Sequence, residues 1–108
     1  MATFSVSAGS DGALNVAGEL DLAAADEFAT AVLEHATGSS GPVVLDFAGV
    51  EFLDSTGVSA LVRIRNTFLD QGRTLSLRNV AERPLRVLQI TAMDAVFEIE
   101  NAPQRDGV

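Results

Sequence analysis

The chain has 108 residues, of which 47% are hydrophobic and 20% charged, as expected for one globular domain with a buried core. It contains no Cys, Lys, Tyr or Trp, which excludes disulfides, thiolate nucleophiles, thiolate metal sites, a Walker lysine and a Schiff base. The apolar stretches are far shorter than the ~20 residues of a membrane span, and the first residues lack an export signal, so we expect a cytoplasmic protein without membrane insertion.

The net charge of −8 is unevenly distributed along the chain. Residues 1–62 contain nine acidic residues and no Arg or Lys, whereas residues 63–108 contain seven Arg and six acidic residues. A negative field repels nucleic acid and anionic lipid and attracts a basic protein surface. The acidity therefore predicts no direct nucleic-acid binding, and it serves either solubility or docking to a basic partner.

The N-terminal third predicts a β-hairpin followed by a helix. Residues 3–8 alternate between apolar and polar side chains, and residues 13–20 alternate again after a turn-forming stretch. Helical spacing then begins, with Asp21 as the expected N-cap and Gly38 as the end of the helix. The expected buried face of this helix comprises Leu22, Ala25, Phe28, Ala29, Val32, Leu33 and Ala36.

The remainder predicts alternating strands and helices. Residues 42–47 form a nearly continuous apolar run, which is typical of a strand buried on both faces and paired in parallel. Further strands are expected at 74–78 and, at a sheet edge, at 96–99. Two helices lie between these strands, one ended by Gly72 and the other opened by Pro84. Their expected apolar faces comprise Val58, Leu61, Val62, Phe68 and Leu69 in the former, and Leu85, Leu88 and Ile90 in the latter.

This order predicts an α/β fold with a mostly parallel sheet. We expect a single domain over residues 1–108, with its core at about 3–100 and a flexible tail at 101–108. In such sheets, functional groups gather where the carboxyl ends of strands meet the amino ends of helices. Two segments qualify, residues 18–21 and residues 51–57.

The segment Asp-Ser-Thr-Gly stands at the expected start of the second helix. Asp54 or Ser55 at the N-cap would satisfy a free backbone N–H, worth about 1 kcal/mol, and this structural role explains most such residues. Gly57, inside the first helical turn, costs up to about 1 kcal/mol relative to Ala and would let another backbone approach Ser55. With Phe52 and Leu53 anchoring the loop in the core, the pattern predicts an exposed hydroxyl suited to modification.

Catalytic and metal-binding interpretations have little support. A nucleophilic serine needs a base, but the one His, His35, falls late in the first helix, and no Gly-x-Ser-x-Gly elbow is present. Glu19, Asp21 and Asp54 could converge on Mg²⁺, although caps and solvated loop acids explain them more simply. We therefore expect no catalytic residue, no metal site and no cofactor.

Three segments carry a resemblance to a known family. They are Gly-Glu-Leu-Asp at 18–21, Val-Leu-Asp-Phe-Ala-Gly-Val-Glu-Phe-Leu-Asp-Ser-Thr-Gly at 44–57, and Leu-Arg-Val-Leu-Gln-Ile-Thr-Ala-Met at 85–93. Over about residues 3–100 the chain resembles the STAS domain of bacterial anti-sigma factor antagonists. The resemblance implies a STAS-type sandwich, with a mostly parallel sheet of four to five strands, an N-terminal hairpin and three to four helices.

The resemblance also implies a function. Such proteins bind an anti-sigma factor that is itself a serine kinase, and thereby release a sigma factor. The kinase phosphorylates the Ser after the Asp of the motif, which is Ser55 here, and a cognate phosphatase restores the binding form. The resemblance places Asp21 beside this loop, so the implied partner surface comprises Asp21, Asp54, Ser55, Thr56 and Gly57.

The third helix departs from the family pattern. Ala81 and Glu82 stand where relatives commonly carry Ser-Pro, and Ala92 replaces a Gly that ends the helix. A left-handed Ala92 would carry strain of about 1 kcal/mol.

An alternative function is that of a non-catalytic scaffold subunit in a signalling complex or a lipid-transport complex. The Ser55 motif and the stand-alone length favour the phosphorylation switch.

Overall fold

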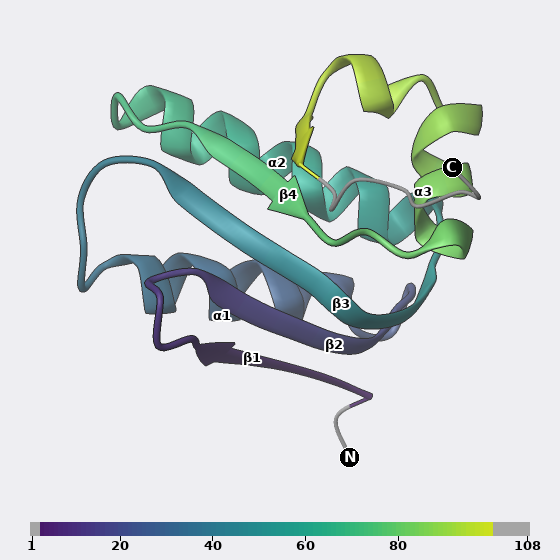
Figure 1. Cartoon of the computed structure of the whole chain (residues 1–108), viewed down its shortest axis with the longest axis horizontal. Helices are drawn as coiled ribbons and strands as arrows, with labels where there is room; N and C mark the ends of the chain where they lie inside the picture. The colour runs from purple at the N-terminus through teal and green to yellow at the C-terminus, as the bar shows by residue number, and fades with distance from the viewer. Residues whose placement is uncertain (1–2, 101–108) are drawn as a thin grey trace, which may run out of the picture.

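The computed structural model describes residues 3–100 of the chain. Within this range, strands and helices alternate after an initial hairpin (Figure 1). The elements are β1 (Phe4–Ala8), β2 (Leu14–Leu20), α1 (Ala25–Ala36), β3 (Val43–Leu53), α2 (Ser55–Asp70), β4 (Leu75–Arg78), α3 (Glu82–Ile90), the 3₁₀ helix η1 (Met93–Ala95) and β5 (Glu98–Glu100).

The strands form one five-stranded sheet in the order β1-β2-β3-β4-β5. β1 and β2 pair antiparallel, whereas β2 to β5 are parallel to one another. Helices α1 and α2 lie along one face of the sheet, and α3 lies near the carboxyl ends of the strands (Figure 1). The predicted α/β fold, with its N-terminal hairpin and mostly parallel sheet, is confirmed.

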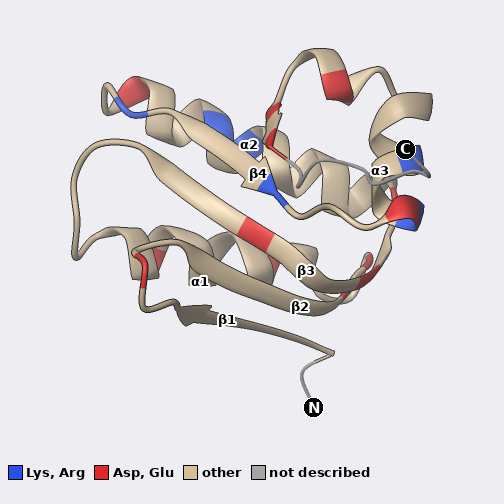
Figure 2. Cartoon of the chain, viewed as in Figure 1, with Lys and Arg blue, Asp and Glu red and all other residues tan. Residues whose placement is uncertain are grey.

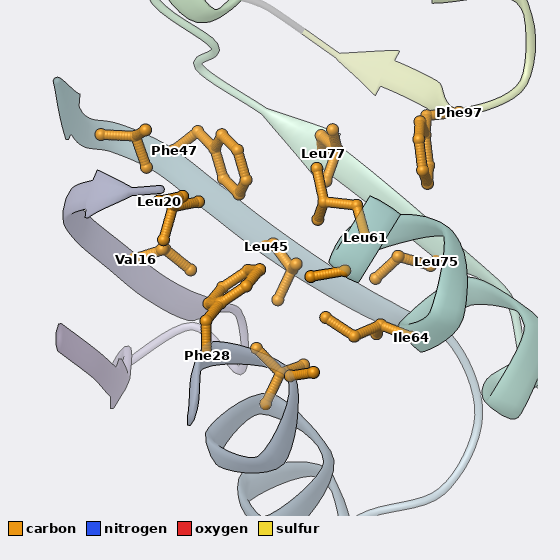
Figure 3. Packing of buried hydrophobic residues seen from close by; sticks show 14 of the residues in the cluster. Val16, Leu20, Phe28, Leu45, Phe47, Leu61, Ile64, Leu75, Leu77 and Phe97 are labelled. Carbon is orange, nitrogen blue, oxygen red and sulfur yellow. The ribbon is translucent and has the colours of Figure 1, made fainter. Parts of the chain in front are cut away.

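The core fills the space between the sheet and the first two helices (Figure 3). Apolar residues of α1 and α2 recur at helical spacing and meet side chains from the inner face of β2, β3 and β4. Burying a large apolar side chain contributes about 1.5–3 kcal/mol, so this layer supplies most of the driving force for folding. Its largest fully buried members include Phe28, Phe47, Phe68, Leu45, Leu61, Ile64 and Leu77.

β3 differs from its prediction in both length and burial. Burial alternates along Val43, Val44 and Leu45, so one face of the strand meets the helices and the other is more open. The expected burial on both faces is therefore wrong, although the parallel pairing is confirmed. The strand also continues to Leu53, because its pairing with β2 runs on to Leu20. Two irregularities in this pairing each insert one extra β3 residue.

These insertions change which side chains face the core. Ala48 and Gly49 are both exposed before the buried Val50, and the next two residues are again both exposed before the buried Leu53. Phe52 consequently points outward and is 47% exposed. The expectation that Phe52 anchors the loop in the core is wrong, whereas Leu53 does so with 3% exposure.

Three residues expected on buried helix faces are exposed. Leu22 precedes α1 and is 76% exposed, Leu69 near the end of α2 is 45% exposed, and Ile90 at the end of α3 is 77% exposed. Each lies at or beyond an end of its helix, where the sheet no longer covers the periodic face. Helix α1 begins only at Ala25, with Ala24 as a cap that makes no side-chain hydrogen bond, so Asp21 is not its N-cap.

The C-terminal elements follow the prediction with shifted boundaries. α3 begins at Glu82, two residues before the buried Pro84. β5 begins two residues later than expected, and the predicted tail at 101–108 lies outside the described residues. Ala92 adopts the left-handed conformation, with φ of 62° and ψ of 17°, so the condition under which we expect strain at this residue is met.

Arg73 lies just before β4, at the end of the sheet opposite α3, and links neighbouring segments there. It is 8% exposed, and its guanidinium donates to the carbonyls of Gly41 (2.7 Å) and Ala36 (2.9 Å) and to the Ser39 hydroxyl (3.0 Å). The guanidinium also lies 5.3 Å from the ring centroid of Phe68. One side chain therefore satisfies the carboxyl end of α1 and fixes the loop that leads to β3.

A second Arg joins acidic residues on the open side of the sheet. Arg78 donates to Asp46 at 2.9 Å and also to Asp11, and the Asn79 amide donates to Asp46 at 3.1 Å. Partial burial acts to raise the pKa of Asp46, but the Ala48 N–H, Arg78 and Asn79 outweigh it and hold the pKa below its ordinary value.

Candidate functional site

The carboxyl ends of β2 and β3 bring the two predicted segments together. Leu20 and Leu53 are register partners at the ends of these strands, and the Asp54 N–H approaches the Leu20 carbonyl at 3.4 Å. The loop after β2 and the start of α2 therefore lie next to each other, as the sequence predicts for the edge where strand carboxyl ends meet helix amino ends.

Asp54 is the N-cap of α2. Its Oδ1 accepts from the backbone N–H of Thr56 (2.9 Å) and of Gly57 (3.1 Å), and also from the Thr56 hydroxyl. Burial acts to raise the pKa of this carboxyl, but donation from the Thr56 hydroxyl and from the N–H groups of Gly57, Thr56 and Leu22 lowers it overall. The carboxylate therefore fixes the loop, and its oxygen is already committed to local donors.

Gly57 is required by close packing inside the chain. A Cβ at this position would lie 2.4 Å from the Leu20 carbonyl oxygen and 2.7 Å from the Leu53 Cδ1. Gly57 is itself buried. The expected close approach of another backbone is present, but this backbone belongs to Leu20 of the same chain and it meets Gly57 inside the domain.

Ser55 is the first residue of α2 and is exposed. Its hydroxyl makes no hydrogen bond to any residue in the described range 3–100, whereas the neighbouring Thr56 hydroxyl is held by Asp54. A shallow hollow of about 330 Å³ adjoins it. The hollow is lined by Ser55, Val58, Ser59, Val62, Thr91 and Met93, so the end of α3 approaches the start of α2 here.

Asp21 lies in the loop beside Asp54 and is half-buried. Its Oδ1 accepts from the Ala24 N–H at 3.1 Å, and its carbonyl accepts from the same group at 3.0 Å. It therefore stabilises the turn that leads into α1. The structure brings Asp21, Asp54, Ser55 and Thr56 to one end of the domain, as predicted.

Exposed apolar residues near this loop were not predicted as part of the site. Leu22 follows Asp21, and its N–H contributes to lowering the pKa of Asp54. Phe52 and Ile90 line a groove of about 470 Å³ between the end of β3 and α3. For Leu22 and Ile90 the signal in the sequence is their place at the end of a helical pattern, whereas Phe52 lies beyond the predicted strand at 42–47 and carries no such signal.

The residues considered for metal binding and for catalysis are also located by the structure. Within residues 3–100, no three His, Asp or Glu side chains lie close enough to hold a metal ion, so Glu19, Asp21 and Asp54 do not form such a group. His35 is exposed in the last turn of α1. No helix among the described residues is long and apolar enough to cross a membrane.

Comparison with known proteins identifies relatives of this domain. The family model described as the Mlab, STAS domain matches residues 4–99. The anti-sigma-B factor antagonist of Bacillus subtilis is 28% identical over 95 residues, which cover 88% of this chain and 85% of that protein.

Solved structures share the fold. An anti-sigma factor antagonist from Mycobacterium paratuberculosis superposes with a TM-score of 0.73 at 24% identity, covering 97% of this chain and 88% of that one. The anti-sigma factor antagonist SpoIIAA superposes in its unphosphorylated form with a TM-score of 0.71 at 16% identity, covering 96% and 91% of the two chains. Its phosphorylated form gives 0.64 at 17% identity, covering 96% and 95%. Since the family match spans nearly the whole described domain, the chain belongs to the STAS domain family.

Proposed function

We propose that this protein is an anti-sigma factor antagonist that binds an anti-sigma factor with serine kinase activity and is switched off by phosphorylation of Ser55. The observation that carries the proposal is the exposed Ser55 hydroxyl, which has no hydrogen-bond partner among the described residues and stands on a loop rigidly capped by Asp54. The relatives named as anti-sigma factor antagonists support the same assignment.

The surface around Ser55 has the character of a protein docking site. Leu22, Phe52 and Ile90 are 76%, 47% and 77% exposed, and exposed apolar side chains gathered near polar ones mark interaction surfaces. Asp21 and the Asp54–Thr56 loop supply the polar part of this surface. Gly57 acts indirectly, by letting the loop pack against Leu20.

Phosphorylation would change this surface without refolding the domain. A phosphate adds about −1.5 to −2 charges. The N–H groups of Thr56 and Gly57 already donate to Asp54, so these two donors are not free to draw the phosphate onto the helix. The group would remain beside the Asp54 carboxylate at the docking surface, where charge and bulk oppose a desolvated interface.

The proposal assigns the remaining roles to partners. ATP belongs to the kinase, and a separate phosphatase regenerates the binding form, so this chain needs no cofactor and no catalytic residue of its own. The site of action is the cytoplasm, where a sigma factor is released. Residues 1–108 act as a single STAS domain.

A labelling experiment tests the proposal. The purified protein is incubated with its cognate anti-sigma factor and ATP, and the phosphate is located by mass spectrometry. We expect one phosphate at Ser55, none in Ser55→Ala, and unchanged labelling in Thr56→Val. Ser55→Ala should retain affinity for the anti-sigma factor, whereas Ser55→Asp should bind poorly.

Two outcomes would contradict the assignment. Labelling at another residue would displace Ser55 as the switch. If no residue were labelled and Ser55→Asp bound the anti-sigma factor as tightly as the wild type, the scaffold function in a signalling or lipid-transport complex would be favoured instead.

A further inference from the structure

A groove with an apolar floor runs between α1 and β1. It has a volume of about 390 Å³. Phe4 and Ala31, both half-buried, supply the apolar lining, and the Phe4 ring meets Phe28 edge-on at 6.1 Å between centroids. The remaining lining residues are Asp26, Glu27, Thr30 and Glu34.

Two of the three carboxylates that line this groove have no ion-pair partner within residues 3–100. Asp26 pairs with Arg63 at 3.0 Å, and Asp11 and Asp46 share Arg78. Glu27 and Glu34, by contrast, make no ion pair with any residue between 3 and 100. Figure 2 shows Arg residues on α2, in the loop before β4, on β4 and on α3, whereas α1 carries acidic residues and no Lys or Arg. The one basic residue of α1 is His35, in its last turn. A ligand for this groove must therefore bring its own positive charge.

The spacing of the two glutamates defines the shape of that ligand. Glu27 and Glu34 are seven residues apart on α1, which places them on one face at about 10.5 Å along the axis. Thr30 and Ala31 lie between them and are small enough to let a second backbone come close. Arg and Lys lay their aliphatic stems on apolar surface while the charged head reaches a carboxylate. The groove thus fits a segment with two cationic side chains about two helical turns apart.

We propose that this groove binds a basic segment of the anti-sigma factor, as a second contact surface besides the Ser55 loop. The inference rests on the proposed function. The inference is supported by charge complementarity, because the groove presents the unpaired carboxylates of Glu27 and Glu34 beside apolar side chains, and a partner would supply the cations. Because long-range attraction acts before contact, the groove would chiefly increase the association rate.

The test measures association with the purified anti-sigma factor used in the labelling experiment, by stopped flow at low and high salt. The variant Glu27→Gln/Glu34→Gln removes both charges while keeping size and hydrogen-bonding capacity. The matched control is Glu98→Gln/Glu100→Gln, which removes the same charge from exposed residues of β5 at the opposite edge of the sheet. Circular dichroism checks that both variants remain folded.

We expect Glu27→Gln/Glu34→Gln to associate about fivefold to tenfold more slowly than the wild type at low salt, and the control to change by less than about twofold. At about 1 M salt the variants should converge, because the Debye length falls to about 3 Å. Equal slowing in the two double variants, or slowing that salt does not abolish, would overturn the second contact surface alone. Failure of the wild type to bind would overturn the proposed function and this inference with it.

Discussion

Substituting Gly57 by Ala should destabilise the protein, although helix propensity alone predicts the opposite. Ala is favoured over Gly inside a helix by about 1 kcal/mol, and Gly57 lies in the first turn of α2. The added methyl would, however, lie 2.4 Å from the Leu20 carbonyl oxygen and 2.7 Å from the Leu53 Cδ1. The carbonyl belongs to the last residue of β2, so it cannot rotate away as a flexible side chain could.

The magnitude follows from the two opposing effects. Overpacking of a close-fitted core costs typically 1–3 kcal/mol, and a clash with backbone falls at the upper end of that range. After subtracting the gain in helix propensity, we expect Gly57→Ala to lower the free energy of unfolding by about 1–2 kcal/mol. For a domain of this size, that corresponds to a fall in Tm of roughly 4–16 °C.

Urea unfolding followed by far-UV circular dichroism measures this change. The chain contains no Trp or Tyr, so intrinsic fluorescence is a poor probe. Gly38→Ala is the matched control, because a Cβ there would have no neighbour nearer than the His35 carbonyl oxygen at 4.0 Å. The control should be neutral or slightly stabilising. If Gly57→Ala were as stable as the wild type, the start of α2 could not be clamped against Leu20, and the account of the loop would be refuted.

Three further substitutions or conditions probe the same structure. Asp54→Ala should lower the free energy of unfolding by about 1–2 kcal/mol, whereas Asp54→Asn, which can still cap α2, should lower it far less. Equal decreases for the two variants in urea unfolding would contradict the capping role of Asp54. Arg73→Leu should lower the free energy of unfolding by about 2–4 kcal/mol, because the carbonyls that Arg73 binds lose their donors. The exposed Arg83→Leu should change it by less than about 0.5 kcal/mol. An unchanged urea midpoint for Arg73→Leu would contradict the role of this hydrogen-bond network. The pKa of Asp46 is lower in the folded protein than in the unfolded chain, so its stabilisation is full above about pH 5 and is lost as the pH falls below about 4. Urea midpoints measured from pH 7 to pH 2.5 should show this loss, and Asp46→Asn should make the profile shallower. The carboxyls of Asp54 and Asp11, whose pKa values are also lowered, contribute the remaining pH dependence.

Local patterns predict much of the fold because each element has one dominant period. The hairpin at the N-terminus alternates with period two, and α1 and α2 bury residues at helical spacing. The apolar run of β3 predicts the parallel pairing that is observed, although the burial on both faces from which the pairing was inferred is wrong. The same patterns fail at the ends of elements, as Leu22 and Ile90 show, because periodicity identifies a face but not where its cover stops.

The candidate site was predictable in position but not in its internal packing. The motif places Ser55 and Asp54 at a helix start, and the structure bears this out. The role of Gly57 depends on Leu20, which is far away in sequence and comes close only through the β2–β3 register. The outward turn of Phe52 likewise depends on an inserted residue in the pairing of two strands, which no single segment encodes.

The order of the strands has a consequence for synthesis. Each strand pairs only with those that precede and follow it in the chain, so the sheet can extend at one edge as the chain emerges, and no later strand must insert between two that already pair. The groups that hold the Ser55 loop, namely the Leu20 carbonyl, the Leu22 N–H and the Asp54 carboxylate, all precede β4. A nascent chain that has released α2 therefore already contains every one of these groups, before the last two strands are made.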